Sequence, residues 1–297
     1  MVDWSAAAVP RRGRDSIWLC RLRRAGDGAC RAHLENPETR LAARARLEAL
    51  LAADLAAGRS VLAGFDFPFG YPSGFAARLA GEAGDWSAVW RLLGEWLVEE
   101  GNNANNRFAV AARLNEHACG RAAPFWGCPS RFAGDFLGQR HHRQHGGVAL
   151  AEQRLADAAG KGPQPVWKLY GAGSAGSQAL TGIPVVQWLR RRFDGAAAIW
   201  PFETGLAPPP RCAGRIVFAE IYPSLVPPRA YNGEVKDAAQ VRSIARHFAS
   251  LDDAGCLGAL FSGAADLSLD ERRRVEREES WILGVAGIRK CQEPVDV

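Results

Sequence analysis

The chain has 297 residues, of which 47% are hydrophobic, 9% aromatic and 23% charged, so a disordered or collagen-like chain is excluded and a folded, enzyme-sized protein is expected. The longest apolar runs are far shorter than the ~20 residues that cross a bilayer, and no leader-like segment opens the chain, so we expect a cytoplasmic protein that does not enter a membrane. The 37 basic and 32 acidic residues give a net charge of +5, which favours anionic partners only weakly, and seven cysteines without a Cys-x-x-Cys pair predict reduced thiols.

The first 66 residues predict a small sheet covered by one helix. A very short strand at 2–5 is followed by strands at 16–23 and 29–34, which the turn-forming residues 25–28 join into an antiparallel pair. Leucines at helical spacing predict an amphipathic helix that begins near Thr39 and ends at Gly58. The apolar run at 60–66 is typical of a strand buried on both faces, and it ends in Asp66.

The rest of the chain predicts a long interruption of this sheet and then its continuation. Residues 71–210 combine helices, such as 86–99 and 107–116, with glycine- and asparagine-rich loops, and we interpret them as one mostly helical insertion. A strand at 215–221 follows, then helices at 237–250 and 269–283. We therefore expect a single α/β domain over 1–297, with three antiparallel strands followed by parallel strands, flanked by helices.

Acidic residues stand where strands are normally apolar. Asp3 lies in the first strand, Asp66 ends the buried strand, and Glu220 shares a strand face with Ile216 and Phe218 by alternation. A buried carboxylate is costly unless it is paired or bound to a metal. A single buried carboxylate is commonly accounted for by an ion pair with an arginine, but three on one sheet suggest a site.

The last predicted helix adds two more carboxylates. Val275 and Ile282 mark an apolar stripe at positions i and i+7, and Glu278 and Glu279 lie at i+3 and i+4 of that stripe, so at least one of them should point inward. Carboxylates from several strands and one helix suit Mg²⁺ or Mn²⁺, and two such ions can activate water for phosphoester cleavage. The candidate metal ligands are Asp3, Asp66, Glu220 and Glu279, and Glu278 joins them as a candidate catalytic residue.

The order of elements and several motifs of the sequence resemble a known family. The order of elements is similar to the ribonuclease H-like fold, and the motifs resemble an uncharacterised bacterial domain-of-unknown-function family with a nuclease-like RNase H fold. These motifs span positions 2 to about 285 and comprise Val2-Asp3-Trp4, Gly64-Phe-Asp66-Phe-Pro68-Phe-Gly70-Tyr-Pro72, 107–113, 124–129, 176–178 with 182–184, and Ala219-Glu220-Ile-Tyr-Pro223.

The resemblance implies that Asp3, Asp66 and Glu220 are candidate metal ligands. The final helix offers Glu278 or Glu279 where ribonuclease H-like enzymes often have aspartate. Proteins that resemble this one are sometimes labelled molybdopterin-guanine dinucleotide biosynthesis proteins, although no residue pattern here supports that label.

Two further segments supply candidate substrate-binding residues. Four asparagines at 102–106 precede a helix and exceed what one N-cap needs, which suggests that Asn106, Arg107 and Arg113 bind a polar anion, although a structural turn accounts for them equally well. The glycine-rich stretch 171–178 follows Lys168 and lacks the Gly-Lys-Ser/Thr of a P-loop. It is either a flexible loop or a loop that binds an anion through its backbone N–H groups. If it binds an anion, the candidate contacts are Lys168, Ser174, Ser177 and Gln178.

Three hypotheses on function follow. The first is a metal-dependent phosphoester hydrolase, nuclease-like, that acts on a nucleic acid or nucleotide with bound Mg²⁺ or Mn²⁺. The second is a non-catalytic or biosynthetic protein that binds a nucleotide or pterin-like ligand. The third, a phosphotransferase of the actin and sugar-kinase type, is disfavoured because the first strand is not followed by the glycine that close approach to ATP phosphates requires.

Overall fold

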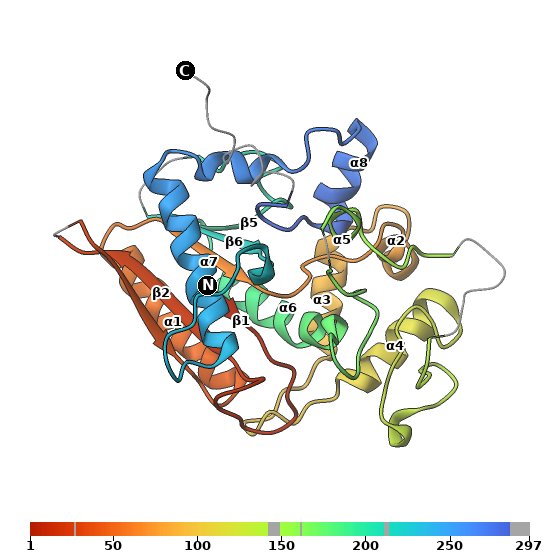
Figure 1. Cartoon of the computed structure of the whole chain (residues 1–297). Coiled ribbons are helices and arrows are strands. Elements are labelled where there is room, and N and C mark those ends of the chain that lie inside the picture. The colour runs from red at the N-terminus through yellow and green to blue at the C-terminus, as the bar shows by residue number, and fades with distance from the viewer. Residues whose placement is uncertain (27, 142–148, 161, 211–213, 286–297) are drawn as a thin grey trace.

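Six strands form one mixed sheet, in the order β3-β2-β1-β4-β6-β5. The structure is a computed structural model that describes residues 1–26, 28–141, 149–160, 162–210 and 214–285 (Figure 1). β1 pairs antiparallel with β2, and β2 with β3, whereas β1, β4, β6 and β5 run parallel to one another. The strands are β1 (Val2–Asp3), β2 (Trp18–Arg24), β3 (Cys30–Glu35), β4 (Val61–Phe65), β5 (Ala197–Ile199) and β6 (Ile216–Glu220). The predicted α/β class, with antiparallel strands followed by parallel strands, is confirmed.

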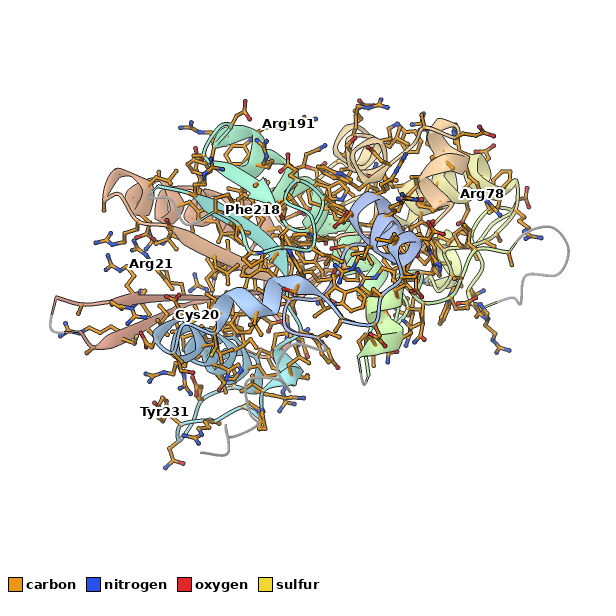
Figure 2. The ribbon with its side chains drawn as sticks, turned by 90° about the horizontal axis from the view of Figure 1, so that it is seen from above. Cys20, Arg21, Arg78, Arg191, Phe218 and Tyr231 are labelled. Atoms are coloured by element: carbon orange, nitrogen blue, oxygen red, sulfur yellow. The ribbon has the colours of Figure 1, made fainter. Side chains whose placement is uncertain are left out.

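Helices cover both faces of this sheet (Figure 1). On one face, Phe65 and Phe218 share a core with leucines of α1 (Arg40–Ala56) and with α6 (Ala175–Arg192). On the other face, Val217 and Ala219 pack against Ile244 and Phe248 of α7 (Lys236–Asp253). In Figure 2 Phe218 lies inside the molecule. The alternation of side chains along the strands therefore decides which helix each residue meets.

The N-terminal third follows the prediction closely. Thr39 accepts a hydrogen bond from the backbone N–H of Ala42 and so caps α1, which begins one residue later. α1 ends at Ala56, just before Gly58 adopts a positive φ of 68°. Both strands of the predicted hairpin are present, each shifted by one or two residues.

The segment 71–210 differs from the predicted insertion in two respects. It contains β5, so the sheet resumes at Ala197 and not at 215. α6 begins at Ala175, within the glycine-rich stretch, and carries Pro184 in its interior. The remaining elements of this segment are α2 (Phe75–Ala80), α3 (Trp86–Trp96), α4 (Arg107–Cys119), η1 (Ser130–Phe132) and α5 (Leu155–Ala159).

The last predicted helix is shorter than expected. After η2 (Pro223–Leu225), α7 and η3 (Leu257–Ser262), α8 covers Leu269–Arg274 and continues as one π-helical turn, η4 (Val275–Glu279). Ser280 then has a φ of 63°, and the chain runs beside β6, where the N–H of Leu283 donates to the carbonyl of Glu220 (2.9 Å). Pairing with β6 replaces the last turn that periodicity predicts. Within the described ranges, no helix is long and apolar enough to cross a membrane.

Gly70 lies where the loop after β4 passes directly against η4. The N–H of Tyr71 donates to the carbonyl of Glu278 (3.1 Å), so the two backbones are in contact. A Cβ atom at Gly70 would overlap the backbone of Glu278 and Glu279. The glycine therefore permits the approach that fixes η4 against this loop.

Gly70→Ala is expected to lower the free energy of unfolding by about 3 kcal/mol, because backbone atoms on both sides have to move apart. Gly101→Ala is the matched control, since a Cβ at Gly101 meets no described atom within 4 Å, and it should change stability by less than about 0.5 kcal/mol. Urea denaturation of both variants measures the difference. Equal stability of the two would contradict the close packing of η4.

Candidate functional site

Two aspartates meet at the carboxyl end of the adjacent parallel strands β1 and β4. Val2 pairs with Phe65, and the N–H of Asp66 donates to the carbonyl of Val2 (3.2 Å). This register places Asp3 beside Asp66. The N–H of Trp4 donates to Oδ1 of Asp66 (2.7 Å), and the two carboxyl groups are hydrogen-bonded to each other. Because Val2 and Phe65 face α1 and α6, both aspartates face α7.

The pKa values of both aspartates are raised. Burial, followed by the negative charge of Asp66, holds the pKa of Asp3 well above its usual range. Burial also raises the pKa of Asp66 to about 6, although hydrogen bonds from Asp3 and from the Trp4 N–H oppose this shift. Two carboxyl groups in such contact hold one proton between them to a higher pH than separate aspartates do.

The aspartate pair lies in a cavity of about 290 Å³. Gln178 of α6 enters it and donates from Nε2 to the carbonyl of Trp4 (2.7 Å). Tyr222 follows β6, and Gln240 belongs to α7. The cavity therefore combines two acidic groups with amides and a phenol, an arrangement that suits a polar ligand with a cation.

Glu220 reaches the same cavity but is bound by an arginine. Both of its carboxylate oxygens accept hydrogen bonds from Arg154 (2.7 Å each), and Oε2 also accepts from the N–H of Phe69 (3.0 Å). Arg154 is 1% exposed and makes a second ion pair with Asp157 (2.7 Å). Burial raises the pKa of Glu220, while the charge of Arg154 opposes that rise. By alternation Glu220 lies on the α6 face of the sheet, whereas the aspartate pair lies on the α7 face. The cavity at the strand ends is lined by residues from both faces.

The two glutamates of η4 contact the loop after β4. Glu278 accepts hydrogen bonds from the Ser73 hydroxyl (3.0 Å) and the Gly74 N–H (2.8 Å). Glu279 is fully buried and accepts from the N–H of Ser73 (3.1 Å), the N–H of Leu155 (2.7 Å) and the guanidinium of Arg274 (2.8 Å). Through these hydrogen bonds Glu278 and Glu279 hold the loop after β4 and the start of α5 in place.

The asparagine-rich segment and Arg107 form a buried hydrogen-bond network. Asn106 accepts from the N–H of Val98 (2.9 Å) and donates to the carbonyl of Trp96 (2.9 Å). Arg107 donates to the hydroxyl of Ser177 (3.1 Å), which in turn donates to a backbone carbonyl. Burial and the nearby Arg40 lower the pKa of Arg107 to about 10. These contacts join the start of α4 to α6.

The other predicted substrate contacts are spread over the surface. The guanidinium of Arg113 stacks over Trp96, 3.7 Å from the ring centre. Lys168 donates from Nζ to the carbonyl of Ala172, and Ser174 is the N-cap residue of α6. Of the seven predicted substrate-binding residues, Gln178 is the one that lines the cavity beside Asp3 and Asp66.

The sequence reasoning missed Arg154 and Asp237. The charge of Asp237, in the first turn of α7, raises the pKa values of both Asp3 and Asp66. An acidic residue at a helix start is ordinary, because it complements the helix dipole, so the sequence carries no separate signal for it. Arg154 stands in a loop segment without a recognisable motif.

The aspartate pair suits a cation that keeps most of its water. Mg²⁺ binds through one or two carboxylates and retains several waters, and a cation between Asp3 and Asp66 would replace the shared proton. In the part of the chain that the structure describes, no group of three His, Cys, Asp or Glu side chains is placed to hold a metal. A metal here would therefore depend on two carboxylates, water and a bound ligand.

The fold and the cavity define an α/β protein with an acidic pair at the carboxyl edge of its parallel strands. Comparison of the chain with protein-family models, curated proteins and solved structures finds no match.

Asp3→Asn is expected to raise the free energy of unfolding by about 1–2 kcal/mol at pH 8 and by less at pH 5. Above the ordinary aspartate pKa, Asp3 and Asp66 hold more protons in the folded protein than in the unfolded chain. The free energy of unfolding therefore falls as pH rises from that value through about 6, the pKa of Asp66. An amide at position 3 still donates to Asp66 but carries no charge. Urea denaturation across this pH range measures the effect.

The exposed Asp135 provides a control, because Asp135→Asn should give the same small change at both pH values. A gain for Asp3→Asn that does not depend on pH would contradict the shared proton.

Proposed function

We propose that this chain is a metal-dependent phosphoester hydrolase, nuclease-like, that acts on a nucleotide or nucleic acid through Mg²⁺ or Mn²⁺ held by Asp3 and Asp66. The observation that carries the proposal is the contact between these two carboxyl groups in a polar cavity, with raised pKa values. Functional sites concentrate such perturbed acidic pairs. The positive net charge of +5 is compatible with an anionic substrate.

The proposed ribonuclease H-like assignment rests on the sheet. Three antiparallel strands at one end, a parallel strand β4 beside β1, and an acidic residue at the end of each of these two strands agree with that fold. In this assignment the segment between β4 and β6 is an addition that brings Gln178 and Arg154 to the cavity.

Each cavity residue has a role in this proposal. A bound divalent cation supplies Lewis acidity and lowers the pKa of a water molecule. Asp3 and Asp66 would hold the cation in place of their shared proton, and the Gln178 and Gln240 amides and the Tyr222 hydroxyl would hydrogen-bond the substrate. Glu220 and Asp157 hold Arg154 at the wall, where its guanidinium offsets part of their negative charge. Glu278 and Glu279 position the loop that forms the edge of the site.

A second candidate function is a protein that binds a nucleotide or pterin-like ligand without turnover. The observation that favours it is the ion pair of Glu220 with Arg154, which leaves the aspartate pair as the anionic part of the cavity. Such a protein would use the same cavity and would bind its ligand unchanged.

Calorimetric titration with Mn²⁺ tests the metal site directly. Wild-type protein at pH 7.5 should bind Mn²⁺, and Asp66→Asn should weaken binding by at least about tenfold, because even loss of an outer-sphere partner costs about 10–100-fold. Asp135→Asn, in an exposed loop, should bind as wild type does. Equal binding by wild type and Asp66→Asn would remove Asp66 from the site.

Hydrolysis of bis(4-nitrophenyl) phosphate with Mn²⁺ separates the two candidate functions. Turnover by wild type that is lost in Asp66→Asn supports the hydrolase. Mn²⁺ binding without turnover of this ester or of single-stranded oligonucleotides favours the binding protein.

A further inference from the structure

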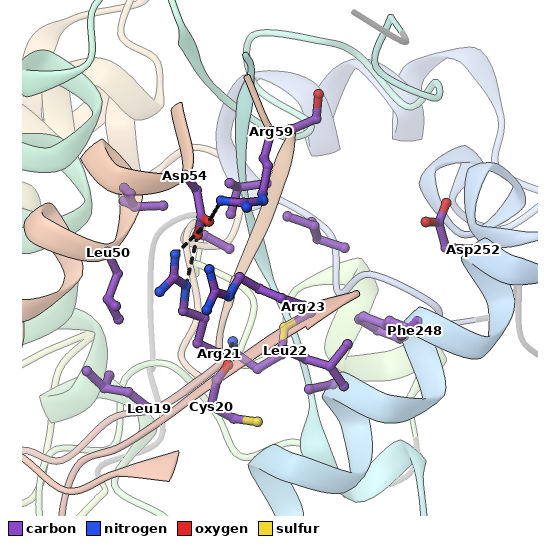
Figure 3. Close-up of a pocket in the computed structure, with 18 of the residues that line it drawn as sticks. Leu19, Cys20, Arg21, Leu22, Arg23, Leu50, Asp54, Arg59, Phe248 and Asp252 are labelled. Carbon is purple, nitrogen blue, oxygen red and sulfur yellow. Dashed lines mark hydrogen bonds and ion pairs between the residues drawn. The ribbon is translucent and has the colours of Figure 1, made fainter. Parts of the chain in front are cut away.

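A second and larger cavity lies at the opposite end of the parallel strands from the aspartate pair. Its volume is about 490 Å³, and it opens where β4 begins, against the second half of β2 and α7 (Figure 3). This volume is within the range of about 300–1,000 Å³ that is typical of sites for small organic ligands. The proposed hydrolase function makes no use of it.

One wall of this cavity carries an excess of positive charge. Arg21, Arg23 and Arg59 approach the same region, and Asp54 is the carboxylate among them (Figure 3). Arg21 donates to Asp54 through Nε (3.0 Å) and Nη2 (2.6 Å), and Arg59 donates through Nη1 (3.2 Å). Asp54 is 6% exposed and has both oxygens occupied by Arg21 and Arg59, so this wall has three guanidinium groups but one carboxylate among them.

Arg23 is the group that this arrangement leaves available. Its side chain is exposed, and it forms no hydrogen bond or ion pair with any residue that the structure describes. The neighbouring Arg24 differs, because it pairs with Asp252 (3.5 Å) and Asp253 of α7. Like charges at close range are unfavourable, so the approach of Arg23 to Arg21 and Arg59 costs free energy that an anion would recover.

The opposite wall is apolar. Leu22 and Leu62 come from the sheet, and Phe248 comes from α7. Figure 3 shows Leu22 and Phe248 on the side of the cavity away from Asp54. A ligand that fills the cavity therefore has an anionic end and an apolar or aromatic body.

We propose that this cavity binds a small organic phosphate, with the phosphate held by Arg21, Arg23 and Arg59 and the apolar body against Leu22 and Phe248. A guanidinium group can donate two parallel hydrogen bonds to two oxygens of a phosphate. Three guanidinium groups therefore match the several oxygens of a phosphate monoester better than the two oxygens of a carboxylate. The site is separate from the aspartate pair, so it is a site for a second ligand and does not depend on hydrolysis.

Calorimetric titration with phenyl phosphate in the presence of EDTA tests this site. Wild-type protein should bind phenyl phosphate more tightly than inorganic phosphate, phenol or benzoate, because only phenyl phosphate uses both walls and all three arginines. Arg23→Ala should weaken binding by about tenfold or more, which corresponds to one charge-assisted hydrogen bond. Because Arg23 has no partner among the described residues and lies near two other guanidinium groups, thermal denaturation should show this variant to be at least as stable as wild type.

Two control variants test whether phenyl phosphate binds in this cavity. Arg191→Ala removes an exposed arginine at the end of α6, outside the cavity, and should leave phenyl phosphate binding unchanged (Figure 2). Asp66→Asn should also leave it unchanged, so failure of the hydrolase proposal does not affect this result. Equal weakening by Arg191→Ala and Arg23→Ala, or binding of phenol as tight as that of phenyl phosphate, would overturn the proposal.

Discussion

The parallel pairing of β1 with β4 is the constraint on which the site depends. This pairing sets Val2 opposite Phe65, and it therefore places Asp3 and Asp66 side by side at the strand ends. Their repulsion and burial destabilise the ionised form of both residues, so the pair retains a proton well above the usual range of aspartate. The apolar packing of Val2 and Phe65 on the other face of the same strands holds the two residues together despite this cost.

The surrounding structure supplies its fully buried acids with hydrogen-bond donors, whereas this partly buried pair has fewer donors. Glu220 and Asp157 are both bound by Arg154, and Glu279 is surrounded by hydrogen-bond donors. Asp3 and Asp66 have the Trp4 N–H and each other, and Asp237 adds to the negative potential. A protein that accepts such a local cost commonly uses it for function, because the unfavourable charge is relieved when a cation binds.

The sequence predicts the sheet and the aspartate pair better than it predicts the rest of the site. Apolar periodicity and turn residues locate β2, β3, α1 and β4. Asp66 stands out because it is an acidic residue directly after the apolar strand β4. Alternation along a strand assigns Glu220 to the face of Phe218, but it does not show that Asp3 and Asp66 occupy the other face. That relation depends on the register between strands distant in sequence.

Local pattern also fails where a long-range contact decides the structure. The stripe of Val275 and Ile282 predicts a continuous helix, yet pairing with β6 ends it at Glu279. β5 has three residues, too few for an alternation signal, and becomes a strand because it pairs with β6. Asn106 and Arg107 resemble ligand contacts because a buried network and a binding site use the same polar side chains.

The shared proton between Asp3 and Asp66 is the central claim, and infrared spectroscopy of protein labelled with ¹³C at the aspartate carboxyl carbon tests it most directly. At pH 7 the difference spectrum between wild type and Asp3→Asn should contain the C=O stretch of a protonated carboxyl group, which disappears when Mn²⁺ is added. A wild-type spectrum at pH 7 that shows only ionised aspartates would contradict the account.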